Sequence, residues 1–165
     1  MATSRFTAVN KELLPDASGM RIGVVVSEWN SDVTENLLKG TRETLSECGA
    51  SLDDMYILYV PGSFELIAGA QLLLENKNIE AVICLGAVIK GETPHFDFVS
   101  SACANGLMNL SIQYKKPVVF GVLTTLDLKQ AHARSGGELG NKGIESATTA
   151  IRMIALQREL EDPWA

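Results

Sequence analysis

Gly86-Ala87-Val88-Ile89-Lys90-Gly91-Glu92-Thr93-Pro94-His95 joins a predicted strand to a predicted helix. Residues 79–85 before it form a short apolar run that suits a buried strand. Residues 99–114 after it are rich in Ala, Leu and Met and lack proline, which favours a helix. Thr93-Pro94 is typical of a helix start, because the threonine hydroxyl can accept hydrogen bonds from free N–H groups and proline needs no acceptor there. A helix start with His95 in its first turn predicts an anion site with a titratable group beside it.

The same stretch resembles a nucleotide-binding P-loop at all but one position. Glu92 stands where that motif carries the lysine that contacts the β- and γ-phosphates. A carboxylate at this position would repel those phosphates, which argues against ATP or GTP. A phosphate monoester needs fewer cationic contacts and remains a candidate ligand.

The composition indicates one globular domain with an acidic surface. The chain has 165 residues, of which 46% are hydrophobic, and its formal net charge is −6. This length suits a single domain, and the hydrophobic fraction is too high for a disordered chain. The negative charge disfavours nucleic acid and anionic membranes, so we expect neither as a partner.

The apolar runs and the cysteines bear on where the protein works. No apolar run approaches the roughly 18 residues of a membrane helix, and the N-terminus lacks the apolar core of a signal peptide. Cys48, Cys84 and Cys103 are odd in number, widely spaced and set in helix-like or strand-like contexts. These features predict reduced core cysteines in a cytoplasmic protein, rather than disulfides or a metal site.

Strands and helices are predicted to alternate along the chain, which implies a parallel sheet covered by helices on both faces. Asp32 and Glu35 resemble a capping box at the start of the first helix. Residues 1–20 form an N-terminal arm with a candidate strand at 5–9. We therefore expect a single doubly wound α/β domain. Its predicted strands are 21–26, 55–60, 79–85 and 117–123, its helices about 32–48, 64–76, 94–114, 127–134 and 144–161, and a glycine-rich loop spans 135–143.

In such sheets, ligands bind beyond the carboxyl ends of the strands. Three segments follow predicted strands: residues 27–30, residues 61–65 and residues 86–95. Phe120, which we expect near the end of a fourth strand, could join them. These segments are the candidate ligand site.

Five motifs follow one another along the chain: Ser27-Glu28-Trp29-Asn30, Val60-Pro61-Gly62-Ser63-Phe64-Glu65, Leu85 to Asp97, Phe120-Gly121-Val122-Leu123-Thr124 and Gly140-Asn141-Lys142-Gly143. In this order they resemble the 6,7-dimethyl-8-ribityllumazine synthase family over about residues 21–160. The resemblance implies a three-layer α/β/α domain spanning residues 1–165, with a flavodoxin-like parallel sheet. It also implies a transferase of riboflavin biosynthesis that condenses 5-amino-6-(D-ribitylamino)uracil with 3,4-dihydroxy-2-butanone 4-phosphate, releasing phosphate and water, without metal or organic cofactor.

The resemblance also implies roles for individual residues. His95 would carry protons, and Trp29 would stack on the pyrimidine ring. The remaining roles fall into three groups: contacts to the uracil and ribityl chain from Asn30, Ser63, Phe64, Glu65, Ala87, Val88, Ile89 and Phe120; contacts to the phosphate from Glu92, Thr93 and Arg134; and auxiliary positive charge from Lys90 and Lys142.

Two residues, Glu138 and Trp29, depart from the family pattern. The histidine other than His95, His132, has no role in it. Glu138 stands where relatives often carry lysine, which removes a cation near the expected phosphate. Trp29 stands where phenylalanine is common, which keeps an aromatic face for stacking. His132 lies between alanines on a short predicted helix without other polar support, so we expect it to be structural.

The resemblance further implies a ring of five subunits with active sites between neighbours, and in some members a 60-subunit shell. Residues 5–9 could add a strand to a neighbour's sheet. Riboflavin synthase is a further candidate partner. Two other functions compete with this one: a non-catalytic lumazine- or flavin-binding protein on the same fold, and a receiver-type signalling module. The second is disfavoured, because the predicted strand ends carry no acidic pair for magnesium.

Overall fold

The fold is built on a four-stranded parallel sheet. The computed structural model describes residues 13–161. The strands β2 (Met55–Val60), β1 (Ile22–Ser27), β3 (Ala81–Ile89) and β4 (Val118–Thr125) lie side by side in that order. Each neighbouring pair is parallel. The predicted parallel sheet is thereby confirmed.

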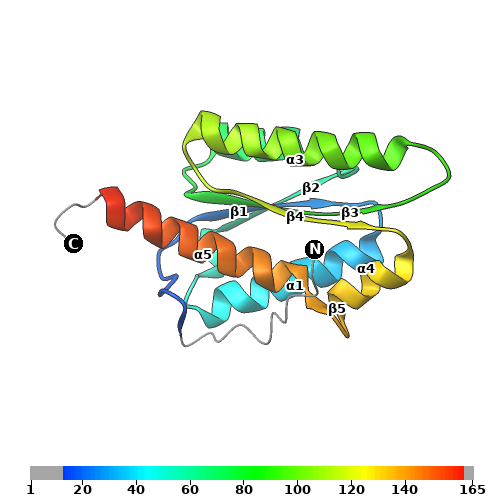
Figure 1. The fold of residues 1–165 in the computed structure, drawn as a ribbon. Coiled ribbons are helices and arrows are strands. Elements are labelled where there is room, and N and C mark those ends of the chain that lie inside the picture. The colour runs from blue at the N-terminus through cyan, green and yellow to red at the C-terminus, as the bar shows by residue number, and fades with distance from the viewer. Residues whose placement is uncertain (1–12, 162–165) are drawn as a thin grey trace.

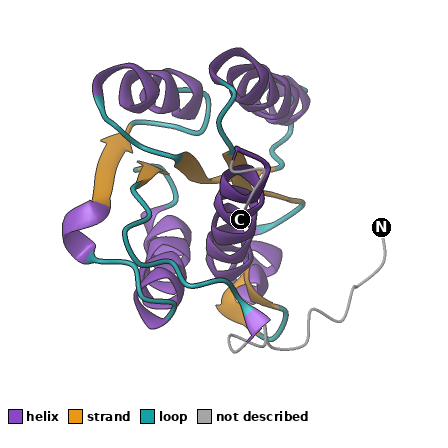
Figure 2. Cartoon of the chain, turned by 90° about the vertical axis from the view of Figure 1, so that its left-hand side faces the viewer, coloured by secondary structure: helices purple, strands orange, loops and turns teal. Residues whose placement is uncertain are grey.

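Within residues 13–161, five helices cover the two faces of this sheet and make three layers (Figure 1). On one face lie α1 (Ser31–Glu47), α4 (Leu128–Arg134) and α5 (Lys142–Glu161). On the other lie α2 (Leu66–Asn76) and α3 (His95–Tyr114). Figure 2 shows the strands edge-on between these helix layers. The order of elements gives the expected flavodoxin-like α/β/α arrangement.

The sheet separates two hydrophobic cores. β1 is buried along its whole length. Val24 and Val26 pack into the core under α1 and α5, whereas Val25 packs into the core under α2 and α3. This alternation follows from the two-residue period of a strand. Ala17 and Met20, from the segment predicted as an arm, are also buried in the first core.

The glycine-rich segment between α4 and α5 forms a small hairpin. Strands β5 (Ser135–Gly137) and β6 (Gly140–Asn141) pair antiparallel. Gly136 and Gly140 have φ values of 117° and 87°, which residues other than glycine rarely adopt. A short 3₁₀ turn, η2 (Leu52–Asp54), precedes β2. Among residues 13–161 no helix is long and apolar enough to cross a membrane.

Local details of the central stretch differ from the prediction. Residues 86–89 continue β3 instead of forming a loop, because they pair with β4 from Gly86–Val122 to Ile89–Thr125. Pro94 is the residue before α3, and no side chain in the described part of the chain caps that helix, so the expected Thr93 cap is wrong. The candidate strand at 5–9 lies outside the described residues.

The first helix also starts differently. Asn30, not Asp32, precedes α1, and no side chain of residues 13–161 caps the helix start. Asn30 has a left-handed φ of 60°, which lets the chain turn sharply out of β1. Asp32 instead approaches His132, with 3.1 Å between Asp32 Oδ2 and His132 Nε2. His132 therefore has the polar partner that the sequence did not reveal.

Candidate active site

A cleft of about 520 Å³ opens at the carboxyl edge of the sheet. The loops after β1 and β2, the end of β3 and the first turn of α3 supply its walls. This is the edge at which parallel α/β sheets bind ligands. The lining residues are Trp29, Asn30, Ser63, Phe64, Glu65, Ala87, Val88, Ile89, His95, Phe98 and Val99.

Exposed aromatic rings dominate the mouth of the cleft. Trp29, Phe64 and Phe98 are 66%, 57% and 74% exposed. The Trp29 ring lies against Gly62, where an added Cβ would come within 2.7 Å of Trp29 Cε3. Glycine at this position therefore lets the ring lie against the loop. Large exposed aromatics around one cleft are typical of a site for a flat or apolar ligand.

Hydrogen bonds tie the three segments of the cleft together. The Ala87 carbonyl accepts from Asn30 Nδ2 at 3.2 Å and from Ser63 Oγ at 3.4 Å. Glu65 Oε2 accepts from the Gly62 N–H at 3.1 Å, which leaves Glu65 Oε1 without a donor among the described residues. The cleft thus offers a carboxylate oxygen beside aromatic rings.

His95 is the first residue of α3, and its side chain is exposed at the cleft. Neither ring nitrogen pairs with any residue of the described part of the chain, so both can reach a ligand. Glu92, Thr93 and Lys90 are exposed in the segment that leads from β3 into α3. They adjoin His95 in sequence but do not line the cleft itself.

Phe120, Arg134 and Lys142 lie apart from the cleft within this chain. Phe120 and Lys142 line a second hollow of about 460 Å³ between β4 and α5. Phe120 is close to the start of β4, which runs on to Thr125, so its expected place at a carboxyl end is wrong. Arg134 ends α4, where its Nη1 donates to the Gln130 carbonyl at 3.2 Å.

Phe98 and Val99 line the cleft although the sequence analysis did not single them out. Their positions carried a usable signal: residues three and four after His95 share its face of a helix. Asp97, two residues after His95, does not line the cleft. This agrees with leaving Asp97 out of the predicted site.

The buried cysteines are not candidate nucleophiles. Cys84 and Cys103 are fully buried. Burial, with the nearby Glu65 charge adding to it, raises the pKa of the Cys103 thiol to about 11. Burial also raises the pKa of Cys84 well above its usual range. Both are therefore neutral thiols near pH 7. Within residues 13–161, no group of three His, Cys, Asp or Glu side chains could hold a metal ion.

The strand order defines a flavodoxin-like α/β protein, and its cleft at the carboxyl edge of the sheet is suited to a flat small molecule. The family model described as 6,7-dimethyl-8-ribityllumazine synthase matches residues 19–158. The chain belongs to this family.

Similar proteins agree with this assignment. The 6,7-dimethyl-8-ribityllumazine synthase of Parabacteroides distasonis is 49% identical over 141 residues, which cover 86% of this chain and 88% of that one. The enzyme of the same name from Porphyromonas gingivalis is 44% identical over 147 residues, covering 89% and 91%. That from Thermus thermophilus is 45% identical over 140 residues, covering 85% and 89%.

Proposed function

We propose that this chain condenses 5-amino-6-(D-ribitylamino)uracil with 3,4-dihydroxy-2-butanone 4-phosphate, the penultimate step of riboflavin biosynthesis. Membership of the family supports the reaction. The proposed site is the cleft, because the exposed Trp29 ring and the His95 imidazole line the same cavity. A flat pyrimidine stacks favourably on such a ring.

The end of β3 suits recognition of the pyrimidine edge. β1 pairs with β3 only as far as Val26 and Leu85, so beyond Leu85 the edge of β3 that faces β1 pairs with no other strand among the described residues. Because backbone groups alternate sides along a strand, Ala87 and Ile89 direct their N–H and C=O groups to the same side. That is the side on which the Ala87 carbonyl meets Asn30 and Ser63. Ser63, Phe64 and Glu65 would then hold the ribityl chain.

The proposed chemistry relies on positioning and proton transfer. The uracil amine attacks the butanone ketone to form an imine, phosphate leaves, and ring closure releases water. An amine is already a competent nucleophile, so holding the two substrates face to face is the main contribution of the protein. His95 would carry the protons, since an imidazole exchanges them near neutral pH.

The phosphate requires positive charge that the cleft lacks. None of the described residues lining it is lysine or arginine. In the proposed site, Glu92, Thr93 and Lys90 approach the phosphate from the segment before α3. The cations Arg134 and Lys142 would come from a neighbouring copy, together with the Phe120 ring. All three lie outside the cleft of their own chain.

A homopentamer with sites between neighbours is therefore part of the proposal. A 60-subunit shell is the larger assembly we favour, and riboflavin synthase is a candidate partner of it. The cytoplasm, which is reducing, suits the buried thiols of Cys84 and Cys103. The small-molecule substrates are the only ligands that the mechanism needs.

Mixing the two substrates with the purified protein tests the function. We expect the fluorescent lumazine product and free phosphate to appear together, one phosphate for each product molecule. A non-catalytic lumazine-binding protein on the same fold would bind the product without releasing phosphate above the uncatalysed rate. That result would overturn the proposed activity.

A further inference from the structure

A buried thiol holds the loop between β2 and α2 from behind the cleft. Cys103, on α3, donates its S–H to the Ser63 carbonyl over 3.1 Å. The Cys103 side chain is fully buried and does not line the cleft. With a pKa of about 11, it keeps the donated proton at neutral pH.

The same loop residue is held from a second direction. The Ser63 hydroxyl, which is also buried, donates to the Ala87 carbonyl. Ser63 Oγ occupies the space where a side chain on Gly86 would begin, since a Cβ there would lie 2.7 Å away. Ser63 is thus fixed between β3 and α3, and Phe64 and Glu65 continue from it into the cleft.

The helix that supplies the thiol also carries His95. Cys103 follows His95 by about two turns, or about 12 Å along the helix. Further along, α3 approaches α2 closely, because a Cβ on Gly106 would come within 2.7 Å of Ile67 Cγ1. The Cys103 bond therefore links the loop to a helix whose position is already set by close packing.

We propose that Cys103 is a positioning residue: it holds the Ser63 carbonyl and so sets how residues 63–65 reach the ribityl chain. This role rests on the proposed function. Loss of the thiol would let the loop relax, together with the Trp29 ring that lies against Gly62 of the same loop. The effect should fall on the uracil substrate and spare the butanone phosphate.

Three variants test this role. Cys103→Ala should raise the KM for the uracil substrate about two- to tenfold, the range expected for losing one hydrogen bond, and leave the butanone phosphate KM unchanged. Cys103→Ser keeps a hydrogen-bond donor, so its KM for the uracil substrate should lie close to that of the parent. Cys84→Ala removes the same sulfur atom from a neighbouring buried position in the sheet and should leave both KM values near those of the parent.

A fluorescence titration with the lumazine product provides a readout that needs no turnover. Weaker product binding by Cys103→Ala but not by Cys84→Ala supports the proposal, even if the parent proves inactive and the proposed activity fails. Equal effects of the two alanine variants, equal rises in both KM values, or an unchanged Cys103→Ala would each show that the thiol only fills space.

Discussion

His95 is the residue on which the proton-transfer step depends. His95→Ala should lower kcat by about 10²-fold, the low end for a general acid–base residue, because substrate positioning survives the change. Product binding should stay within a few-fold, since the aromatic wall of the cleft is intact. Asp97→Ala, which alters the same helical turn outside the cleft, is the control. If kcat of His95→Ala fell by less than twofold, His95 would not be the proton carrier.

Arg134 should act on one substrate. If a neighbouring copy supplies it to the phosphate, Arg134→Ala raises the butanone phosphate KM and leaves uracil binding nearly unchanged. Inorganic phosphate should inhibit the parent competitively and inhibit the variant less. Steady-state kinetics with each substrate varied in turn provide the measurement. Equal damage toward both substrates would identify Arg134 as a structural residue, held by its bond to the Gln130 carbonyl.

The buried Cys103 thiol makes stability depend on alkaline pH. Its pKa is raised from an ordinary value of 9.0 to about 11. Between these values the unfolded chain loses a proton that the folded chain keeps, so the free energy of unfolding falls as the pH rises through this window. Below the window, this contribution to stability is fully present.

Urea unfolding of the parent and of Cys103→Ser at about pH 8 and about pH 10 measures this dependence. Serine does not titrate in this window, so the variant should lose less stability than the parent between the two values. Cys84 acts in the same direction in both proteins, because burial raises its pKa as well. Equal losses in the two proteins would contradict the shifted Cys103 pKa.

At the scale of elements, the strands could be predicted because each is an apolar run bounded by turn residues. Residues 21–26 predict β1 to within one residue at each end. The end of β3 could not be predicted, since Gly86 and the residues after it read as a loop. They become strand through pairing with β4, which is distant in sequence.

Only part of the candidate site could be predicted from the sequence. Trp29, Glu65 and His95 could be predicted to lie together, because parallel strands share one carboxyl edge. Phe120 could not be assigned correctly, since its distance from the edge depends on how far β4 continues. The Asp32–His132 contact was equally hidden, because it joins α1 to α4, which lie far apart in the sequence. Local sequence patterns predict the helices and strands, but the contacts between them can be seen only in the folded structure.

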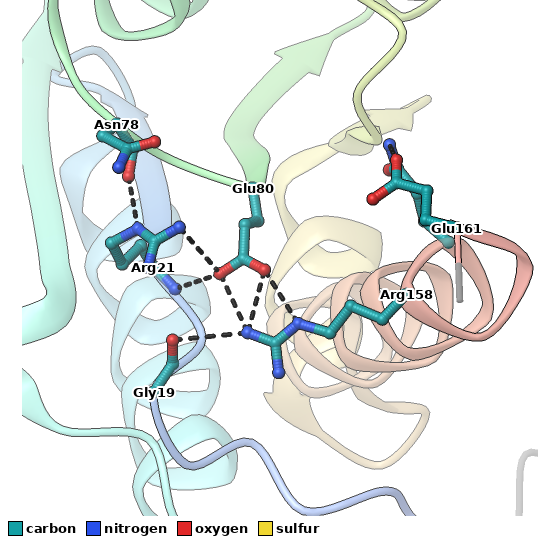
Figure 3. Close-up of polar contacts among 7 residues, drawn as sticks. Gly19, Arg21, Asn78, Glu80, Arg158 and Glu161 are labelled. Carbon is teal, nitrogen blue, oxygen red and sulfur yellow. Dashed lines mark hydrogen bonds and ion pairs between the residues drawn. The ribbon is translucent and has the colours of Figure 1, made fainter. Parts of the chain in front are cut away.

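At the other edge of the sheet, one carboxylate joins three elements (Figure 3). Glu80, just before β3, accepts from Arg158 Nε at 2.8 Å, from Arg158 Nη2 at 3.1 Å and from the Arg21 N–H at 3.0 Å. These bonds tie the last turns of α5 to the amino ends of β1 and β3. Arg158 also reaches the Gly19 carbonyl.

Glu80→Ala should lower the free energy of unfolding by about 1–2 kcal/mol, because it breaks a bidentate pair and leaves the Arg21 N–H without its acceptor. The side chains are partly exposed, so added salt should reduce the difference from the parent. Glu159→Ala removes an exposed carboxylate beside Arg158 that makes no ion pair among the described residues, and it should cost little. Similar losses in the two variants would show that charge number, not the Glu80 contacts, sets the effect.

At the scale of the whole molecule, the cleft and the hollow beside Phe120 lie apart within one chain, and the proposed ring would join them as two halves of one site. The chain mass is 17.8 kDa. Light scattering should therefore give about 90 kDa for a ring of five or about 1.1 MDa for a shell of sixty. A monomer would contradict both assemblies and the shared site.

A mixing experiment tests the shared site directly. His95→Ala damages the cleft half and Arg134→Ala the neighbour's half, so each pure variant assembles only damaged sites. When the two are unfolded, mixed in equal amounts and refolded together, about a quarter of the interfaces should join an intact cleft to an intact Arg134. Turnover at low butanone phosphate should then exceed the average of the two variants refolded separately. If each chain housed its own complete site, mixing would restore nothing, because every chain would still carry one of the two lesions.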